Sequence, residues 1–145
     1  MMLQTITLLT DEEYEKYKPH IPSMYRSWWL QAPGSSRDTV CTVDYTGNIN
    51  SDAYTANCII SVRPVLVFDL DMSDPRFWYR SEKLAGQKFE YGKYTWTFLD
   101  VKLGKMSVIC DSVIAKRCFD PESNNWDKSE LKSWLETEGL KLITP

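Results

Sequence analysis

Side chains able to carry out catalysis are few among the 145 residues of this chain. His20 is its single histidine, and it lies between Pro19 and Pro22 with no neighbour that would activate it as a general base. A Ser–His–Asp triad or a histidine-containing zinc site would have to use this one residue. No pair of carboxylates stands out as a general acid and base. These residue types therefore favour a protein that is not an enzyme.

The cysteines, which could bind a metal or form a redox pair, show no motif for either. Four are present and none forms Cys-x-x-Cys, so zinc-ribbon and thioredoxin-like sites are unsupported. In a reducing compartment, free cysteines are most often small apolar side chains of the core, which is what we expect for Cys41, Cys58, Cys110 and Cys118. The alternative is a redox pair between Cys41 and Cys58.

Acidic residues near the middle of the chain offer the oxygen ligands that calcium prefers. Asp69, Asp71 and Asp74 are closely spaced, but they lack the glycine and the terminal glutamate of an EF-hand loop. Turn formation explains these residues better. We therefore expect neither a metal nor a cofactor.

Residues 35–57 are suited to recognition instead. This segment is rich in Tyr, Ser, Asn and Gly, which are typical of adaptable binding surfaces, although turn formation also explains many of them. The residues expected to contact a ligand are Trp29, Arg37, Tyr45, Asn48, Asn50, Tyr54 and Arg63. The guanidinium fork of Arg63 suits a carboxylate or a phosphate, but an arginine before a proline can also be buried and tie strands together.

The composition limits the kinds of partner. The chain carries a formal net charge of −3, and its basic residues are scattered. General nucleic-acid binding depends on a basic face that displaces phosphate counterions, so it is not expected. There is no secretory signal and no run of about 20 apolar residues, so no membrane association is expected.

The first half of the chain, residues 1–70, is predicted to be mostly β-structure. The predicted strands cover residues 3–9, 26–30, 39–45, 49–54 and 58–70. The turn Thr46-Gly47-Asn48 joins two of them in a hairpin. Pro64 interrupts the last strand, because proline cannot donate to a sheet ladder. A capping box at residues 10–13 predicts a short helix that ends near Lys18.

Trp28 and Trp29 follow each other in a predicted strand, so their side chains point to opposite faces of the sheet. If the sheet has one covered face, one ring packs in the core and the other lies in a groove, where it can meet a ligand. If both rings are structural, each indole N–H needs a hydrogen-bond partner.

The second half, residues 89–145, follows an acidic connector over residues 71–88. Its predicted elements are strands over residues 89–102 and 106–115, a turn at residues 103–105, and a helix from Trp126 to Gly139. Trp78 and Tyr79 in the connector are candidate interface residues, because exposed aromatic side chains often mark contacts. At this length the halves are expected to form a single domain, residues 1–145.

These segments resemble a family of uncharacterised bacterial and phage domains. The matching motifs are Trp28-Trp29-Leu30, the turn at residues 44–49, Val62-Arg63-Pro64, and residues 126–135 with the pattern W-x-x-S-x-L-x-x-W-L. The resemblance implies a fold similar to those of C-type lectins and sulfatase-modifying factors, with its segments in a circularly permuted order. Gln31 and Ser61 depart from the family pattern, which has a basic residue and a glycine there. The family carries no established activity to this chain.

The expected fold is α+β, with a mainly antiparallel sheet and two short helices. The expected function is that of a non-enzymatic binding module, which recognises a protein or glycan through an aromatic and Asn-rich hairpin-and-loop face. An alternative is a phage or mobile-element accessory protein that inhibits a host factor by direct protein binding. A third, an oxidase related to formylglycine-generating enzymes, would need cysteines to converge at an exposed site. The expected location is the cytoplasm or a phage particle, and a homo-oligomer is compatible with the sequence.

Overall fold

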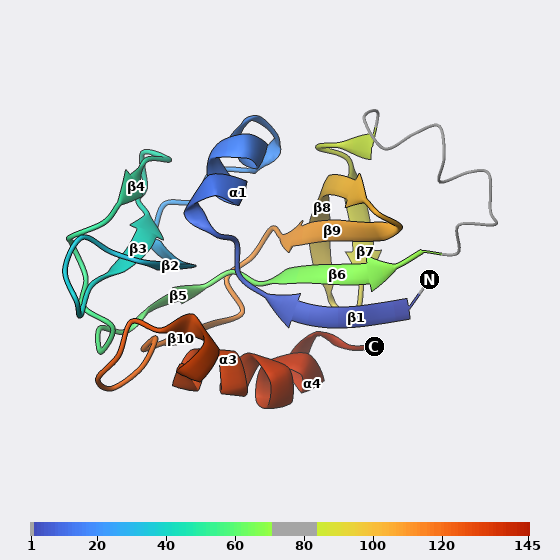
Figure 1. Ribbon diagram of the computed structural model, residues 1–145. Coiled ribbons are helices and arrows are strands. Elements are labelled where there is room, and N and C mark those ends of the chain that lie inside the picture. The colour runs from blue at the N-terminus through green and yellow to red at the C-terminus, as the bar shows by residue number, and fades with distance from the viewer. Residues whose placement is uncertain (1, 71–83) are drawn as a thin grey trace.

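The first of two sheets is antiparallel throughout (Figure 1). The computed structural model describes residues 2–70 and 84–145. Within them, this sheet has five strands in the order β1-β6-β9-β8-β7. Their bounds are β1 Met2–Thr7, β6 Val65–Asp69, β7 Lys88–Tyr91, β8 Tyr94–Lys102 and β9 Lys105–Cys110.

The second sheet contains the double-tryptophan strand. In the described part of the chain its order is β10-β5-β2-β3-β4, and β2 and β5 are its one parallel pair. The bounds are β2 Trp28–Pro33, β3 Val40–Val43, β4 Ile49–Asn50, β5 Ile60–Val62 and β10 Ala115–Arg117. The prediction of an α+β fold with mainly antiparallel pairing is confirmed, although the strands form two sheets and not one.

The chain passes from one sheet to the other at Arg63 and Pro64. Val62 ends β5 in the second sheet, and Val65 begins β6 in the first. The predicted interruption of the strand at Pro64 is confirmed, since this residue has no N–H to donate, while its carbonyl accepts from the Cys110 amide at 2.9 Å. The interruption is therefore one of the places where the chain passes between the sheets.

The N-terminal helix begins at the predicted capping box. Thr10 Oγ1 accepts from the Glu13 amide at 3.1 Å, and the Glu13 carboxylate accepts from the Thr10 amide at 2.8 Å. The helix α1, Asp11–Tyr17, continues into a short 3-10 turn η1, Lys18–His20, which contains Pro19. Both the start and the end of the predicted helix are confirmed.

The second half contains one more turn than predicted. The β8–β9 hairpin turns at residues 103–104 as expected, but β9 ends at Cys110 and not at Ala115. The sequence prediction also missed a turn at Gly92, which separates β7 from β8. Gly92 has φ +60°, and a Cβ there would lie 2.1 Å from the Ile143 carbonyl oxygen. A glycine is therefore required for the C-terminal segment to pack against this turn.

The C-terminal helical segment is longer than predicted. It begins with the 3-10 turn η3, Trp126–Lys128, and continues through α3 Glu130–Trp134, the π-helix η4 Leu135–Gly139 and α4 Leu140–Ile143. The prediction that Gly139 ends the helix is wrong, because its φ of −60° and ψ of −43° are helical. A Cβ at Gly139 would lie 3.1 Å from Leu135 Cδ2, so this glycine permits close packing within the helix.

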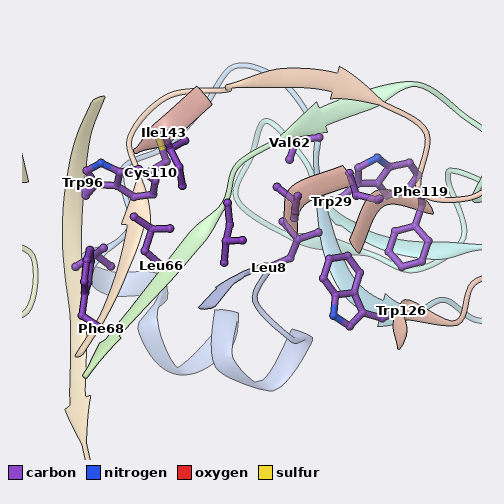
Figure 2. Close-up of a cluster of buried hydrophobic side chains, with 14 of the residues drawn as sticks. Leu8, Trp29, Val62, Leu66, Phe68, Trp96, Cys110, Phe119, Trp126 and Ile143 are labelled. Atoms are coloured by element: carbon purple, nitrogen blue, oxygen red, sulfur yellow. The ribbon is translucent and has the colours of Figure 1, made fainter. Parts of the chain in front are cut away.

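Buried side chains form two clusters on opposite sides of β2. The central cluster extends from Trp96 and Phe68 on the first sheet to Trp29 on the second and Phe119 in the loop after β10 (Figure 2). The second cluster contains Trp28 and residues of α1. The predicted opposite orientation of the tryptophans is confirmed, and both rings are buried because α1 covers one face and the C-terminal segment covers the other.

Several predicted features lie outside the described residues. These are Asp71, Asp74, Trp78, Tyr79 and most of the connector over residues 71–88. Among the helices that the structure describes, none is both long and apolar enough to cross a bilayer.

Candidate functional site

The β3–β4 turn, residues 44–48, presents two of the predicted ligand-binding residues to solvent; we call it the hairpin tip. Tyr45 is 71% exposed and Asn48 is also exposed. The side chain of Asp44 organises the turn, because its Oδ1 accepts from the Thr46 amide at 2.9 Å, from the Asn48 amide at 3.1 Å, and from the Thr46 hydroxyl. The hydrogen bond from the Thr46 hydroxyl and those from the turn amides lower the pKa of Asp44 below its ordinary value. The tip is therefore an ordered turn that carries exposed side chains.

A contact from α1 anchors the hairpin tip. The Tyr14 hydroxyl donates to the Gly47 carbonyl at 2.6 Å, and the Tyr14 ring packs edge-on against Trp28 with centroids 5.5 Å apart. Burial, the largest cause, raises the pKa of Tyr14, so the hydroxyl keeps its proton and remains a donor at neutral pH. The tip is thus tied to the second cluster.

Other predicted residues of the hairpin-and-loop segment lie away from the tip. Asn50 Oδ1 accepts from the amides of Asp52 and Ala53, at 3.1 Å and 3.0 Å, which is the chemistry of a turn. Tyr54 is half-buried against the central cluster. Arg37 is exposed in the turn before β3, at the end of that strand opposite the hairpin tip. The structure therefore groups Tyr45 with Asn48 and separates them from Arg37 and Tyr54.

Trp29 is placed in the core. Its side chain is completely buried, its indole N–H donates to the Arg117 carbonyl at 2.9 Å, and its ring packs edge-on against Phe119. The hydrogen bond joins β2 to β10, on the far side of β5. These contacts give Trp29 a structural role and leave it no exposed surface in this structure.

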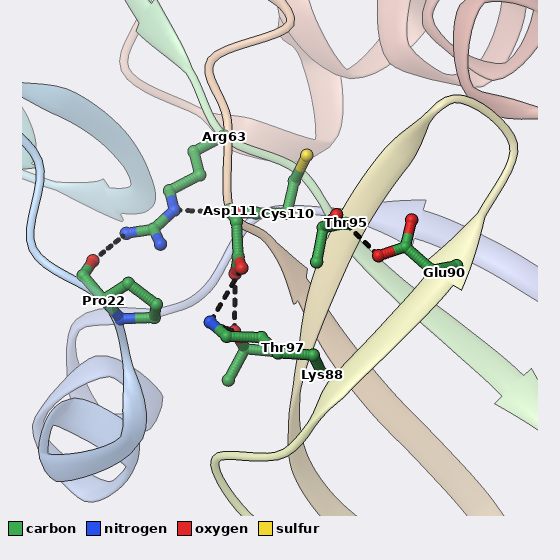
Figure 3. A network of polar contacts seen from close by, with 8 residues as sticks. All are labelled: Pro22, Arg63, Lys88, Glu90, Thr95, Thr97, Cys110 and Asp111. Atoms are coloured by element: carbon green, nitrogen blue, oxygen red, sulfur yellow. Dashed lines mark hydrogen bonds and ion pairs between the residues drawn. The ribbon is translucent and has the colours of Figure 1, made fainter.

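Arg63 is buried beside Trp28, between β5 of the second sheet and β6 of the first. Only 1% of it is exposed, and its guanidinium carbon lies 5.0 Å from the centre of the Trp28 ring. Nε donates to the Cys110 carbonyl at 2.6 Å and Nη1 donates to the Pro22 carbonyl at 2.9 Å (Figure 3). Burial lowers the pKa of Arg63 to about 10, which leaves it charged at neutral pH.

A cavity of about 130 Å³ lies between α1, the hairpin tip and Arg63, and we call it the Arg63 cavity. Its lining residues are Tyr14, Lys18, Ile21, Pro22, Ser23, Met24, Trp28, Val43, Asp44, Thr46, Gly47 and Arg63. The sequence prediction missed this cavity because these residues come from segments that are far apart in the chain. The one signal in the sequence was Arg63, which was already a candidate for anion binding.

The cysteines are free thiols in two kinds of environment. Cys41 and Cys110 are buried, whereas Cys58 and Cys118 are half-buried. Cys41 belongs to the second cluster, while Cys58 packs against the central cluster. Within residues 2–70 and 84–145, no group of three or more His, Cys, Asp or Glu side chains is arranged to hold a metal ion.

Alkylation of the folded protein is expected to modify Cys58 and Cys118 well before Cys41 and Cys110. The thiolate is the reactive species, and burial raises the pKa of both buried thiols, to about 11 for Cys110. Mass spectrometry of peptides after brief iodoacetamide treatment at pH 8 measures the four rates. In urea all four cysteines should react alike. Modification of Cys110 in the folded protein as fast as Cys58 would contradict its buried position.

Comparison of the chain with models of protein families, with curated proteins and with solved structures found no match. The proposed function is therefore inferred from the hairpin tip. The resemblance described from the sequence stays a prediction.

Proposed function

We propose that the chain is a non-enzymatic binding module that recognises a protein or glycan through the hairpin tip. The observation that carries this proposal is the exposure of Tyr45, at 71%, on a turn whose backbone is held by Asp44 and Tyr14. Tyrosine supplies a large amphipathic contact area with little loss of side-chain entropy on binding. A turn that is already ordered further reduces the entropic cost of association.

The proposal includes a C-type-lectin-like or modifying-factor-like relationship of the fold. It is supported by the Trp28-Trp29-Leu30 and Val62-Arg63-Pro64 motifs, which resemble those of the bacterial and phage domains. In lectin-like relatives of this broader fold, the corresponding hairpin-and-loop surface displays variable residues that contact ligands. The proposal assigns that position to Tyr45 and Asn48, which are both exposed.

Substitution of Tyr45 by alanine is expected to reduce capture of the partner at least tenfold. Truncation of a tyrosine that anchors an interface costs about 2 kcal/mol or more of binding free energy. Immobilised protein is exposed to lysate of the natural host cell, and the captured material is quantified by mass spectrometry before and after treatment of the lysate with glycosidases. Loss of capture after that treatment identifies a glycan, and unchanged capture identifies a protein.

The matched control is Leu103→Ala, because Leu103 is 91% exposed but lies in the β8–β9 turn of the other sheet. This variant should capture the same partner as the unsubstituted protein. Equal capture by the Tyr45→Ala, Asn48→Ala and Leu103→Ala variants would contradict recognition through the hairpin tip.

A further inference from the structure

We propose that the Arg63 cavity is a binding site for a carboxylate, which is held by the positive charge of Arg63. The site stands apart from the proposed function, since a small carboxylate can occupy the cavity whether or not Tyr45 and Asn48 contact a partner. The inference is carried by three observations: an uncompensated buried charge, a cavity beside it, and the chemistry of the cavity walls.

The charge of Arg63 has no anionic partner in the part of the chain that the structure describes. Its two hydrogen-bond acceptors are the neutral carbonyls of Cys110 and Pro22, and Nη2 has no acceptor among the described residues. No carboxylate oxygen of residues 2–70 or 84–145 forms an ion pair with it. A buried charge without an opposite charge is strongly unfavourable, so an anion that enters the cavity is favoured.

The carboxylate of the acidic residue that follows Cys110 already has other partners. The Asp111 carboxylate accepts from Lys88 Nζ at 2.7 Å and from the Thr97 hydroxyl at 2.5 Å (Figure 3). Lys88 and Thr97 belong to neighbouring strands of the first sheet, so this pair fixes the carboxylate away from an ion-pair contact with Arg63. The negative charge of Asp111 favours the charged form of Arg63 at long range, but the guanidinium has no direct anionic partner among the described residues.

The walls of the cavity suit a carboxylate attached to a small apolar body. Tyr14, Trp28, Ile21, Met24 and Val43 supply aromatic and aliphatic surface, while Lys18, Ser23 and Thr46 supply polar groups. A cavity of about 150 Å³ in another protein holds one benzene molecule, and the Arg63 cavity, at about 130 Å³, is comparable. The single negative charge of a carboxylate matches one guanidinium. A phosphate dianion would meet stronger repulsion from Asp44, which also lines the cavity.

The probe for this site is benzoate, and benzamide is its neutral counterpart of nearly the same shape. Both are titrated into ¹⁵N-labelled protein, and the chemical shifts of the Trp28 indole N–H and the Arg63 Nε–H are followed. Benzoate is expected to cause saturable shifts at these two groups, with a dissociation constant at least tenfold lower than that for benzamide. Equal affinity for benzoate and benzamide would overturn the proposal.

Two substitutions of exposed serines test the location of binding without removing Arg63. Ser23 lines the cavity, so Ser23→Trp should block it and weaken benzoate binding at least tenfold. Ser133 lies on α3, away from the cavity, so Ser133→Trp should bind benzoate as the unsubstituted protein does. Equal weakening by both substitutions, or by neither, would contradict binding in the Arg63 cavity.

A second titration distinguishes the two sources of a carboxylate. An acetylated and amidated peptide with one internal glutamate represents an acidic side chain of a partner, whereas benzoate represents a free small-molecule acid. Saturable binding of either probe that Ser23→Trp abolishes supports the site and identifies its source. If neither probe binds, the proposed site is wrong. That outcome does not affect the capture of a partner through Tyr45, which is tested separately.

Discussion

Substitution of Trp29 by alanine is expected to lower the free energy of unfolding by about 3–5 kcal/mol, the range for large aromatic residues removed from a core. The Trp29 ring is completely buried between the second sheet and the C-terminal segment, against Phe119. Its removal leaves a cavity and also leaves the Arg117 carbonyl without the indole donor. Urea-induced unfolding followed by circular dichroism measures the change.

The control for this prediction is Tyr45→Ala, which should alter the free energy of unfolding by no more than about 0.5 kcal/mol, as is usual for exposed positions. Trp29→Phe should lie between the two, because it keeps part of the apolar ring but loses the N–H donor. A decrease in the free energy of unfolding of less than about 1 kcal/mol for Trp29→Ala would resemble that of an ordinary surface substitution. It would show that the ring is not part of the core.

Substitution of Arg63 by methionine is expected to destabilise the protein by about 2–4 kcal/mol. The buried carbonyl of Cys110 and the partly buried carbonyl of Pro22 lose their donors, and an unsatisfied buried acceptor costs about 1–3 kcal/mol. Removal of an uncompensated buried charge offsets part of this cost. The expected loss of stability is therefore smaller than the summed cost of the two unsatisfied carbonyls. Urea-induced unfolding at neutral pH gives the value.

Arg63→Lys separates the charge from the geometry of the guanidinium. A lysine keeps the positive charge but cannot place two donors on two carbonyls with the spacing of the arginine fork. We expect this variant also to be destabilised, by about 1–3 kcal/mol, through the loss of one donor. Full stability of Arg63→Lys would mean that the hydrogen bonds to Cys110 and Pro22 contribute little to the free energy of unfolding.

Local features of the fold were predictable because they depend on residues that are close in sequence. The capping box around Thr10 and the break at Pro64 follow from backbone chemistry within a few residues. The alternation of Trp28 and Trp29 across β2 follows from the geometry of any strand. Each was predicted, and each is present in the structure.

Features that depend on long-range packing were not predictable. The break at Pro64 did not show that the chain changes sheets there, and nothing near Trp28 and Trp29 showed that helices cover both faces of β2. Gly139 was predicted to end a helix, since glycine often follows helix ends, but its role is to allow close approach of Leu135. The turn at Gly92 had a local signal, a glycine between two aromatic strand residues, which the prediction overlooked.

The same distinction between local and long-range features applies to the candidate site. Exposed Tyr45 and Asn48 could be predicted from turn chemistry, because a tight hairpin leaves its tip side chains in solvent. For Trp29 and Arg63 the sequence left burial and ligand contact as alternatives. It could not decide between them, since burial depends on segments more than 40 residues away, such as Cys110 beside Arg63, which is separated from it by 47 positions. The Arg63 cavity likewise exists only once α1, β2 and the hairpin tip have packed together.

The most direct test of the proposed recognition surface is site-specific photo-crosslinking in lysate of the natural host cell. A photoreactive phenylalanine analogue replaces Tyr45 in one sample and Leu103 in another, since both positions are exposed but lie on different sheets. Recognition through the hairpin tip predicts one discrete crosslinked species from position 45 and none from position 103. The same species from both positions, or no species from position 45, would contradict it.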